Sequence, residues 1–560
     1  MINVSQGDVP VVLFAARKEG AIVNDFFSGT VVSGSAAGSL PSAGERKTVT
    51  TAVPRLLIAA PHGRSGKTTA TITLLAALRD AGLTVQAFKK GPDFIDPSWL
   101  TLLTGRPCRN LDAFLMEKPD IVRSVARYSA SADIAVIEGA MGLYDGVDLE
   151  GSGSTAVVAK TVQAPVLLVV DTTRMTRSVA AMVMGYQHFD PQVHIAGVIL
   201  NKVARPRHEK MLVAAVEHYC GIPVVGVIPK NRGLSIPDRH LGLIPAGEVD
   251  ELVGKILAAG AQARQYFNLD AILQIARQAP PLGVAEGGRS VGEGGAIAGQ
   301  MSSYGAGFEQ PDSNMRYEHR PEDAAPAGSP AGPGVVSPIA HQRPRIGIIR
   351  DRAFSFYYPE NLEALQAAGA ELVFLDALSA TALPDVHALY IGGGFPEVFA
   401  ERLAANQALL QDLRNKVEAG LPVYAECGGL MFLGRSIISG EAVYPLAGIF
   451  PFDVVMCQKP QGHGYEEVQV VGENPYYPPG TILRGHEFHH SRLVNLEEGQ
   501  ARFALRVTRG KGIDGLHDGL VYKNVLACYL HLHALTVPGW APALVERARR
   551  YMGQGDRTTK

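Results

Sequence analysis

Short apolar runs alternate with longer amphipathic stretches between residues 55 and 245. Arg55–Ala60 is an almost continuous apolar run of strand length, and Thr68–Ala81 has the apolar spacing of a helix. Further strands are predicted at Val85–Lys89, Ile134–Glu138, Val166–Asp171 and Ile195–Asn201. Strands that alternate with helices in this way predict an α/β fold whose sheet is mostly parallel and carries helices on both faces.

A second α/β unit is predicted after residue 344. Its strands are predicted at Arg345–Ile349, Glu371–Leu375, Ala388–Ile391 and Val423–Ala425. The run from Pro280 to Pro344 is rich in Gly, Pro, Ala and Ser, so it buries little surface and is typical of a linker. We therefore expect a partly disordered N-terminal extension (1–54), a first domain (55–265), a largely disordered linker (266–344), a second domain (345–545) and a C-terminal tail (546–560).

Composition narrows the class of protein. The 560 residues are 46% hydrophobic and 19% charged, which is ordinary for a soluble globular protein. The formal net charge of -2 gives no overall attraction to nucleic acid or to an anionic membrane. We find no signal peptide, no apolar run of about 18 residues, and no CxxC spacing among the five cysteines. These features predict a cytoplasmic protein with no nucleic-acid or membrane partner.

A phosphate-binding loop is predicted between the first strand and the first helix. The stretch 56–69 joins an apolar run, a loop of small residues and a helix start, and it ends in Gly66-Lys67-Thr68-Thr69. Backbone N–H groups of such a loop and the helix N-terminus attract phosphate oxygens. The full GxxxxGK[ST] pattern fails at its first glycine, where Pro61 stands. We assign to ATP the residues Gly63, Gly66, Lys67, Thr68, Thr69 and Lys89.

Acidic residues follow the next two predicted strands. Asp93 and Glu138 are candidates to hold Mg²⁺ together with the Thr68 hydroxyl, because a metal on a triphosphate needs one or two carboxylates. Asp96 and Asp145 are placed to position a substrate or a second metal. The alternative is that these acids cap helices or turns. Another candidate is Asn201, which either bonds an adenine edge or is a simple turn asparagine.

A second site is predicted around Cys427. An apolar strand, this cysteine and Gly428-Gly429 resemble a nucleophile elbow, with Ala425 in place of the usual first glycine. The helix N-terminus is expected to lower the pKa of the thiol. The alternative is a buried structural cysteine, which the adjacent glycines disfavour.

Other segments supply the remaining parts of cysteine chemistry. Gly393 and Gly394 follow a strand, and their N–H groups with that of Gly428 would form an oxyanion hole. A general base is available from His531 or His533, of which we favour His531. No acid stands two residues after His531, so a Cys–His dyad is favoured over a triad.

Together these residues resemble the cobyrinic acid a,c-diamide synthase family, which joins a dethiobiotin-synthetase-like ATP domain to a class I glutamine amidotransferase domain of flavodoxin-like fold. The likeness spans about residues 55–245 and 345–545. The segments that carry it are GKTT at 66–69, GPDFIDP at 91–97, GRPCRNLD at 105–112, EGAMGLYDG at 138–146, IGGGFPE at 391–397, AECGGLM at 425–431, RGHEFHHS at 484–491 and YLHLH at 529–533.

The resemblance implies a glutamine-hydrolysing carbon–nitrogen ligase of cobalamin biosynthesis. In this family ATP phosphorylates an acetate side chain of a tetrapyrrole, and ammonia from glutamine attacks the acyl phosphate. Cys427 and His531 match the glutaminase positions, and Lys67, Thr68, Asp93 and Glu138 match the ATP and Mg²⁺ positions. Asp96 and Asp145 match positions that handle the substrate or the intermediate. Family members lack the acid of the usual triad, in line with the dyad.

Several alternatives stay open. Family members usually carry Lys-Val-Gly-Pro-Asp-Tyr where this chain has the stretch 89–94, which ends in Phe94, and Ser98-Trp99-Leu100 also departs from the family pattern. These changes resemble a subgroup that amidates sirohaem-type tetrapyrroles in dissimilatory sulfur metabolism, so cobyrinate is favoured with sirohaem or sirohydrochlorin as the alternative. Cobyric acid synthase, a MinD-type regulatory ATPase and a catalytically silent binding protein rank lower. A homodimer is kept open as the assembly.

Overall fold

The computed structural model describes residues 48–230, 260–285, 343–496 and 502–558, together with a few positions between 238 and 256. The described residues all belong to one compact unit. Most of the predicted N-terminal extension and of the predicted linker lie outside them.

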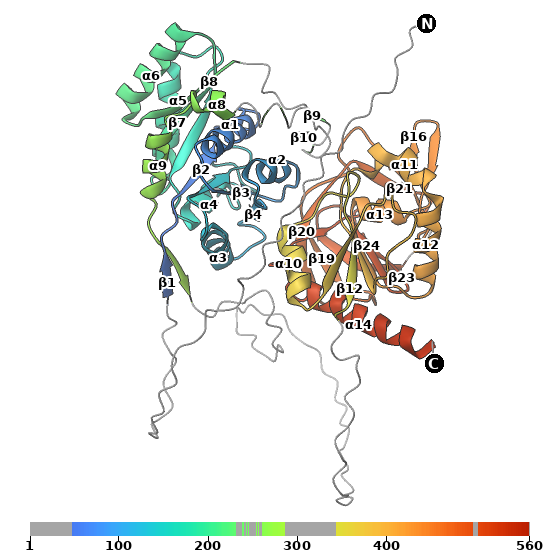
Figure 1. Cartoon of the computed structure of the whole chain (residues 1–560). Helices are drawn as coiled ribbons and strands as arrows, with labels where there is room; N and C mark the ends of the chain where they lie inside the picture. The colour runs from blue at the N-terminus through green and yellow to red at the C-terminus, as the bar shows by residue number, and fades with distance from the viewer. Residues whose placement is uncertain are drawn as a thin grey trace, which may run out of the picture. The chain divides into compact units, whose positions relative to one another are not determined.

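The first domain is built on a parallel sheet of seven strands (Figure 1). All neighbouring strands pair in parallel, so the predicted sheet type is confirmed. In sheet order the strands are β4 (Arg109–Leu111), β3 (Val85–Lys90), β5 (Ile134–Glu138), β2 (Arg55–Ala59), β6 (Val166–Asp171), β7 (Ile195–Val203) and β8 (Val224–Pro229). Both edge strands, β4 and β8, were not predicted from the sequence.

Helices cover both faces of this sheet, as predicted. Alternate residues of β2 face opposite layers: Leu56 and Ile58 belong to one buried cluster, and Leu57 and Ala59 belong to the other. The first layer is formed by α1 (Lys67–Asp80), α2 (Ile95–Thr104), α8 (Gly260–Arg264) and α9 (Leu269–Arg277). The second is formed by α3 (Lys118–Ser129), α4 (Thr155–Thr161), α5 (Ser178–Phe189) and α6 (Pro206–Cys220).

Segments from both sides of the predicted first domain add to its core. Helix α9 buries Ile272 and Ala276, and the strand β11 (Leu282–Ala285) buries Leu282. Strand β11 pairs antiparallel with β1 (Thr48–Thr51), which precedes the predicted start at residue 55. Ordered structure therefore extends on both sides of the 55–265 range.

The second domain has a mixed sheet of ten strands. Five strands are parallel, in the order β13 (Glu371–Leu375), β12 (Arg345–Ile349), β14 (Ala388–Ile391), β15 (Val423–Glu426) and β24 (Val525–Cys528). The sheet continues antiparallel through β23 (His517–Tyr522), β22 (Arg502–Arg509), β19 (Gly462–Val470), β20 (Ile482–His489) and β25 (His531–Leu532). Four of the parallel strands were predicted, whereas β24 and the antiparallel half were not.

Helices again lie on the two faces of this sheet. One buried cluster contains residues of α10 (Pro359–Ala367) and α14 (Trp540–Thr558), and the other contains residues of α11 (Ala400–Ala405), α12 (Gln407–Glu418) and α13 (Gly428–Leu433). Helix α14 continues through the predicted tail and buries Ala548. A small second sheet contains β16 (Ser436–Ser439), β17 (Ala442–Pro445), β18 (Asp453–Met456) and β21 (Ser491–Val494).

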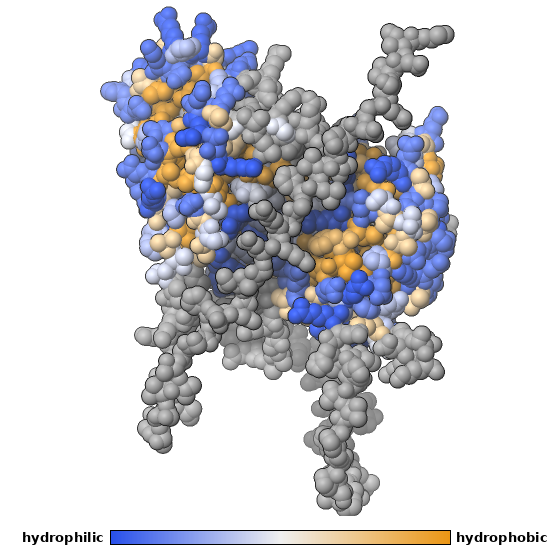
Figure 2. Space-filling model, in the orientation of Figure 1, coloured by the Kyte–Doolittle hydropathy of each residue, from blue (hydrophilic) through white to orange (hydrophobic). Residues whose placement is uncertain are grey.

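The surface of the first domain is mixed in polarity. Figure 2 shows hydrophilic residues along its outer margin near α6 and hydrophobic residues inside that margin. Leu149 is 99% exposed, and Phe189 and Met141 are also largely exposed. Within the described parts of the chain, every helix is too short or too polar to cross a membrane.

Arg55 connects the segments on both sides of the predicted first domain to the sheet through hydrogen bonds. Its guanidinium is fully buried and donates hydrogen bonds to the carbonyl oxygens of Val53, Val162 and Pro280. Burial lowers the pKa of Arg55 to about 10. Pro280 lies between α9 and β11. The Arg55 side chain therefore links the C-terminal part of the first domain to strand β2.

We expect Arg55→Met to destabilise the first domain by about 2–3 kcal/mol, because buried carbonyl groups lose their donors. The measurement is urea unfolding followed by the fluorescence of Trp99 in a Trp540→Phe background, since the chain has only these 2 tryptophans. Arg264→Met is the control, because it removes a half-exposed ion pair with Asp80 and should cost less than about 0.5 kcal/mol. Equal losses in the two variants would contradict the role of Arg55.

Candidate functional site

The predicted phosphate loop lies between β2 and α1. Gly66 has a φ of 82°, a conformation that favours glycine, and an added Cβ would overlap the side-chain nitrogen of Asn201. Lys67 is nearly buried and its ammonium donates to the Met141 carbonyl at 3.2 Å. Burial lowers the pKa of Lys67 to about 8, and the charge of Lys89 acts in the same direction. The loop and the EGAMGLYDG segment are therefore brought together as predicted.

Three carboxylates meet around the ammonium group of Lys89. It forms an ion pair with Asp96, lies 3.1 Å from Glu138 Oε1 and lies 3.7 Å from Asp93 Oδ2. Burial disfavours its charge, but the three carboxylates outweigh burial and hold the pKa of Lys89 well above its ordinary value. Thr68 Oγ1 donates to Glu138 Oε1 at 2.7 Å and to Asp96 Oδ2 at 3.3 Å.

This carboxylate cluster fits a Mg²⁺ ion that is shared with a nucleotide. The buried Glu138 Oε2 has no hydrogen-bond partner, and a cation already lies among the three carboxylates in the form of Lys89. Among the described residues, no three His, Cys, Asp or Glu side chains are grouped to hold a metal ion by themselves. A Mg²⁺ ion here therefore needs phosphate oxygens or water as further ligands, as is usual for Mg²⁺.

Asp93 also has a structural task. Its Oδ1 accepts hydrogen bonds from the backbone N–H groups of Ile95 and Asp96 at the start of α2. Burial and the nearby Asp96 carboxylate raise the pKa of Asp93 to about 7. The helix cap that we considered as an alternative is thus present in this residue, and its role in holding Mg²⁺ stays a prediction.

The other predicted residues of the first site lie in the loop or near it. Asn201 donates to the Ser65 carbonyl at 3.1 Å and accepts from the Lys202 N–H, so its amide supports the loop from β7. Asp145 is exposed, and its Oδ2 accepts from the N–H of Gly142. Gly63 and Thr69 lie in the loop and in the first turn of α1.

Cys427 lies at a sharp turn between β15 and α13. Its backbone φ is 47° and its ψ is -97°, a strained combination for a residue with a side chain. The following glycines are required by packing, because a Cβ at Gly429 would overlap the Ile391 carbonyl. Strain at a strand-to-helix turn is typical of a nucleophile elbow.

The glycine turn after β14, which contains Gly393 and Gly394, lies close to both Gly428 and His531. A Cβ at Gly428 would lie 2.9 Å from the backbone nitrogen of Gly394, so the two predicted oxyanion segments are adjacent. A Cβ at Gly393 would overlap His531 Cε1. The turn therefore lies against the residue after Cys427 and against the ring of His531.

The two candidate histidines have different carboxylate neighbours. His531 Nδ1 lies 3.7 Å from Glu426 Oε2, and His533 Nε2 lies 3.5 Å from Glu360 Oε2. All four side chains are buried. His531 also lies against the glycine turn, which supports our preference for it as the base.

Glu426 and Glu360 were missed by the sequence analysis. We looked for an acid two residues after His531, whereas Glu426 directly precedes Cys427 on the neighbouring strand β15. Tyr390 donates to its Oε2 at 3.0 Å and the Leu532 N–H donates to its Oε1 at 3.3 Å. The available signal was a charged residue at the end of an otherwise apolar strand.

The expected lowering of the thiol pKa was wrong. Burial raises the pKa of Cys427, the Glu397 carboxylate raises it further, and the Gly428 N–H opposes this only in part. The side chain is 5% exposed, so loss of hydration outweighs the dipole of the six-residue helix α13. Burial therefore favours the neutral thiol of Cys427.

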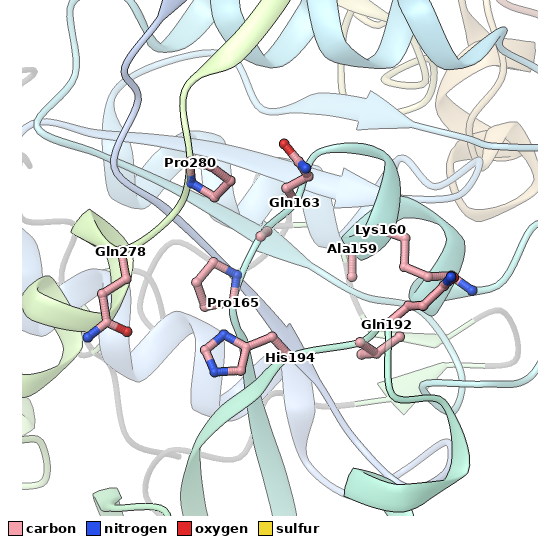
Figure 3. A pocket seen from close by; sticks show the side chains of 10 residues that line it. Ala159, Lys160, Gln163, Pro165, Gln192, His194, Gln278 and Pro280 are labelled. Atoms are coloured by element: carbon pink, nitrogen blue, oxygen red, sulfur yellow. The ribbon is translucent and has the colours of Figure 1, made fainter.

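A cavity of about 380 Å³ lies away from both sites. It is lined by Pro165 and His194, which precede β6 and β7, and by Lys160 and Gln278 among others (Figure 3). The phosphate loop follows the opposite, carboxyl end of β2 in the same sheet. This cavity therefore takes no part in the arrangement of either site.

Comparisons with known proteins agree with the two domains. The sequence model of the CobQ/CobB/MinD/ParA nucleotide binding domain matches residues 56–244, and that of the CobB/CobQ-like glutamine amidotransferase domain matches residues 345–538. A relative named cobyrinate a,c-diamide synthase from Magnetococcus marinus is 43% identical over 493 residues, which cover 88% of this chain and 96% of the relative. Two relatives with the same name are each 39% identical: one from Methanosarcina acetivorans (89% of this chain, 96% of the relative) and one from Archaeoglobus fulgidus (89% and 98%).

We expect Gly66→Ala to weaken nucleotide binding roughly tenfold or more, because a side chain costs ~1–2 kcal/mol in the left-handed conformation and would also overlap Asn201. The measurement is calorimetric titration with Mg²⁺ and a non-hydrolysable ATP analogue. Gly82→Ala is a matched control, since Gly82 also has a φ of 82° but has no atom within 4 Å of an added Cβ. Equal weakening by both variants would show that backbone strain alone, and not loop geometry, explains the loss.

Proposed function

Because the chain belongs to the cobyrinate a,c-diamide synthase family, we propose that it converts the a and c acetate side chains of cobyrinate into carboxamides, with glutamine as nitrogen donor and ATP as phosphoryl donor. Its two domains are those of a glutamine-dependent ligase of cobalamin biosynthesis. One observation carries the proposal: the same chain has a phosphate loop beside a carboxylate cluster, and a glycine turn that lies against both His531 and the residue after the strained Cys427.

The first domain would activate the substrate. The Lys67 ammonium and the loop N–H groups bind the triphosphate, and Asp96 and Asp145 position the acetate group. Thr68, Asp93 and Glu138 would hold Mg²⁺, which when bound neutralises phosphate charge. A carboxylate oxygen attacks the γ-phosphorus and ADP leaves, which gives an acyl phosphate.

Ammonia then attacks the carbonyl carbon of the acyl phosphate. The bond to the phosphate oxygen breaks, phosphate leaves, and the nitrogen loses a proton to give the carboxamide. Activation is needed because a free carboxylate has no good leaving group. The acyl phosphate must be kept from water, and free ammonia must be kept from protonation.

The second domain would supply the ammonia. His531 takes the proton of the Cys427 thiol as the sulfur attacks the carboxamide carbon of glutamine, and it then gives that proton to the leaving ammonia. The N–H groups of Gly393, Gly394 and Gly428 stabilise the oxyanion. Water hydrolyses the remaining thioester to glutamate. The raised pKa of the buried Cys427 supports the need for a base within this step.

Glu426 would stabilise the positive charge that His531 gains in this step. Its carboxylate faces Nδ1, the ring nitrogen that is not needed for proton transfer to sulfur, at 3.7 Å. Nδ1 is buried and makes no hydrogen bond within the described structure, so this carboxylate is its nearest opposite charge among the recorded ion pairs. The proposed dyad is therefore supported by an acid from a position that the usual triad does not use.

The alternative readings are less well supported. The relatives are named for cobyrinate, which favours it over a sirohaem-type substrate. A MinD-type ATPase would leave the domain at residues 345–538 without a role. A homodimeric assembly and a cytoplasmic location stay predictions from the sequence.

The proposal is tested by mass spectrometry of the products formed by the full chain from cobyrinate, glutamine and MgATP. We expect two exchanges of a carboxyl hydroxyl for an amino group, with release of ADP. Cys427→Ser should lose this activity with glutamine and keep it with an ammonium salt, because only the glutaminase nucleophile is removed. Cys457→Ser, a half-buried cysteine of the same domain, is the control and should keep both activities.

Two results would contradict the proposal. Loss of both activities in a folded Cys427→Ser chain would show that the thiol does not serve only glutamine hydrolysis. Amidation of sirohydrochlorin in place of cobyrinate would contradict the proposed identity of the substrate.

We expect Glu426→Gln to lower the rate of glutamate release at saturating glutamine by about one to two powers of ten, the size of effect that a charge within ~4–6 Å has on a titrating group. The amide keeps one acceptor oxygen, so the variant removes the charge and one of the two hydrogen bonds that Glu426 accepts from Tyr390 and the Leu532 N–H. Ammonia-dependent amidation serves as the reference for each variant. Glu360→Gln, which removes the matching charge beside His533, should have a much smaller effect. The opposite ranking of the two variants would identify His533 as the base.

A further inference from the structure

Phe94 of the first domain contacts four aromatic side chains of the second domain. Its ring is stacked on that of Phe356, with centroids 5.1 Å apart and planes 9° apart. It also lies 4.6 Å from the ring of Tyr358, 5.6 Å from that of His486 and 5.3 Å from that of His531. We call these five rings the aromatic cluster. The proposed base of the glutaminase is thus in contact with a residue of the ATP-binding domain.

The aromatic cluster also contacts the residues of the proposed glutaminase site. His531 and His486 are stacked with centroids 4.9 Å apart, and both are buried. The Phe356 N–H donates to the Gly393 carbonyl at 3.0 Å. A displacement of Phe94 therefore reaches the base directly and reaches the proposed oxyanion turn through Phe356.

Within its own domain, Phe94 directly follows Asp93, one of the three carboxylates around Lys89. It stands in the turn that Asp93 closes by accepting from Ile95 and Asp96 at the start of α2. Asp93 and Asp96 are both paired with Lys89 in this structure. Binding of Mg²⁺ and a nucleotide gives these carboxylates a new cation, so the balance of charges in the turn that carries Phe94 changes.

Other contacts hold the two domains together without the aromatic cluster. Tyr465 donates to Asp112 Oδ2 at 2.8 Å, and its ring is stacked on Phe114. Arg109 forms ion pairs with Glu360 and Glu363 of α10. Because these contacts are separate from Phe94, loss of its ring leaves other interdomain contacts in place.

We propose that Phe94 is a positioning residue that makes glutamine hydrolysis respond to occupation of the ATP site. When the carboxylate cluster binds its ligands, the turn at Asp93 sets the ring against His531 and Phe356, and this orients the base and the oxyanion turn. The inference rests on the proposed function and adds to it a direct contact between the two sites. Its consequence is that ammonia is released mainly while an activated acid is present.

The test is a ratio of two rates measured on the full chain. The first is glutamate release with glutamine, MgATP and cobyrinate, and the second is glutamate release with glutamine alone. We expect this ratio to exceed one in the unaltered protein and to fall toward one in Phe94→Ala, by roughly two- to tenfold, the worth of an aromatic pair. A change of stability alone would alter both rates together and leave the ratio unchanged.

Three further variants make the test specific. Phe94→Tyr keeps the ring and should restore the ratio. Phe356→Leu removes the facing ring and should lower the ratio as Phe94→Ala does, with no further loss in the double variant. Tyr465→Phe removes an interdomain hydrogen bond outside the aromatic cluster and should keep the ratio.

The inference is overturned if the unaltered protein has a ratio of one, if Phe94→Ala keeps the full ratio, or if Tyr465→Phe lowers it equally. Ammonia-dependent amidation of cobyrinate is measured in the same samples. If the unaltered protein has ammonia-dependent amidation and Phe94→Ala leaves the ratio unchanged, the role of Phe94 in coupling the two sites is rejected and the proposed function is kept. Absence of this amidation from the unaltered protein would reject the proposed function itself.

Discussion

The buried ion pairs of Lys89 are the interaction on which the first site depends. Three carboxylates stand close together at the ends of neighbouring strands, and in a low dielectric they would repel one another strongly without a central cation. The register of β3 and β5 sets Lys89 directly beside Glu138, so the sheet itself places the pair. Thr68 then joins from the first turn of α1. The cation partner, the carboxylates and the phosphate loop are thus positioned by the same few strands.

The second site follows the same geometric rule. The glycine turn, Cys427 and His531 come after β14, β15 and β24, which are consecutive neighbours in a parallel part of the sheet. The carboxyl ends of parallel strands meet at one edge, and this is where open α/β sheets bind ligands. Each domain therefore forms its site from loops at one sheet edge, and the aromatic cluster around Phe94 lies between the two sites.

The sequence was sufficient for most of the parallel strands and for the motifs that follow them, because both have strong local signals: apolar runs, glycine pairs and isolated reactive side chains. The parallel strands β4, β8 and β24 were missed. The sequence was insufficient for the antiparallel strands. The strand Gly462–Val470 alternates polar and apolar residues and even buries Glu466, so its pattern does not identify it as core. Glu426 and Phe94 were missed as partners of His531 because such contacts depend on strand order and on packing between segments far apart in the chain. The error in the thiol pKa has the same origin, since burial cannot be read from a strand-turn-helix motif.

The central claim is that one chain transfers nitrogen from the side chain of glutamine to an acid activated by ATP. The most direct measurement follows heavy nitrogen from the side-chain amide of glutamine into the tetrapyrrole product, in the presence of ordinary ammonium in the solution. Our account predicts that the new carboxamide groups carry the heavy isotope and that Cys427→Ser incorporates only the ordinary one. Carboxamide groups that carry ordinary nitrogen in the unaltered protein would show that the two sites do not work together, and would contradict the account.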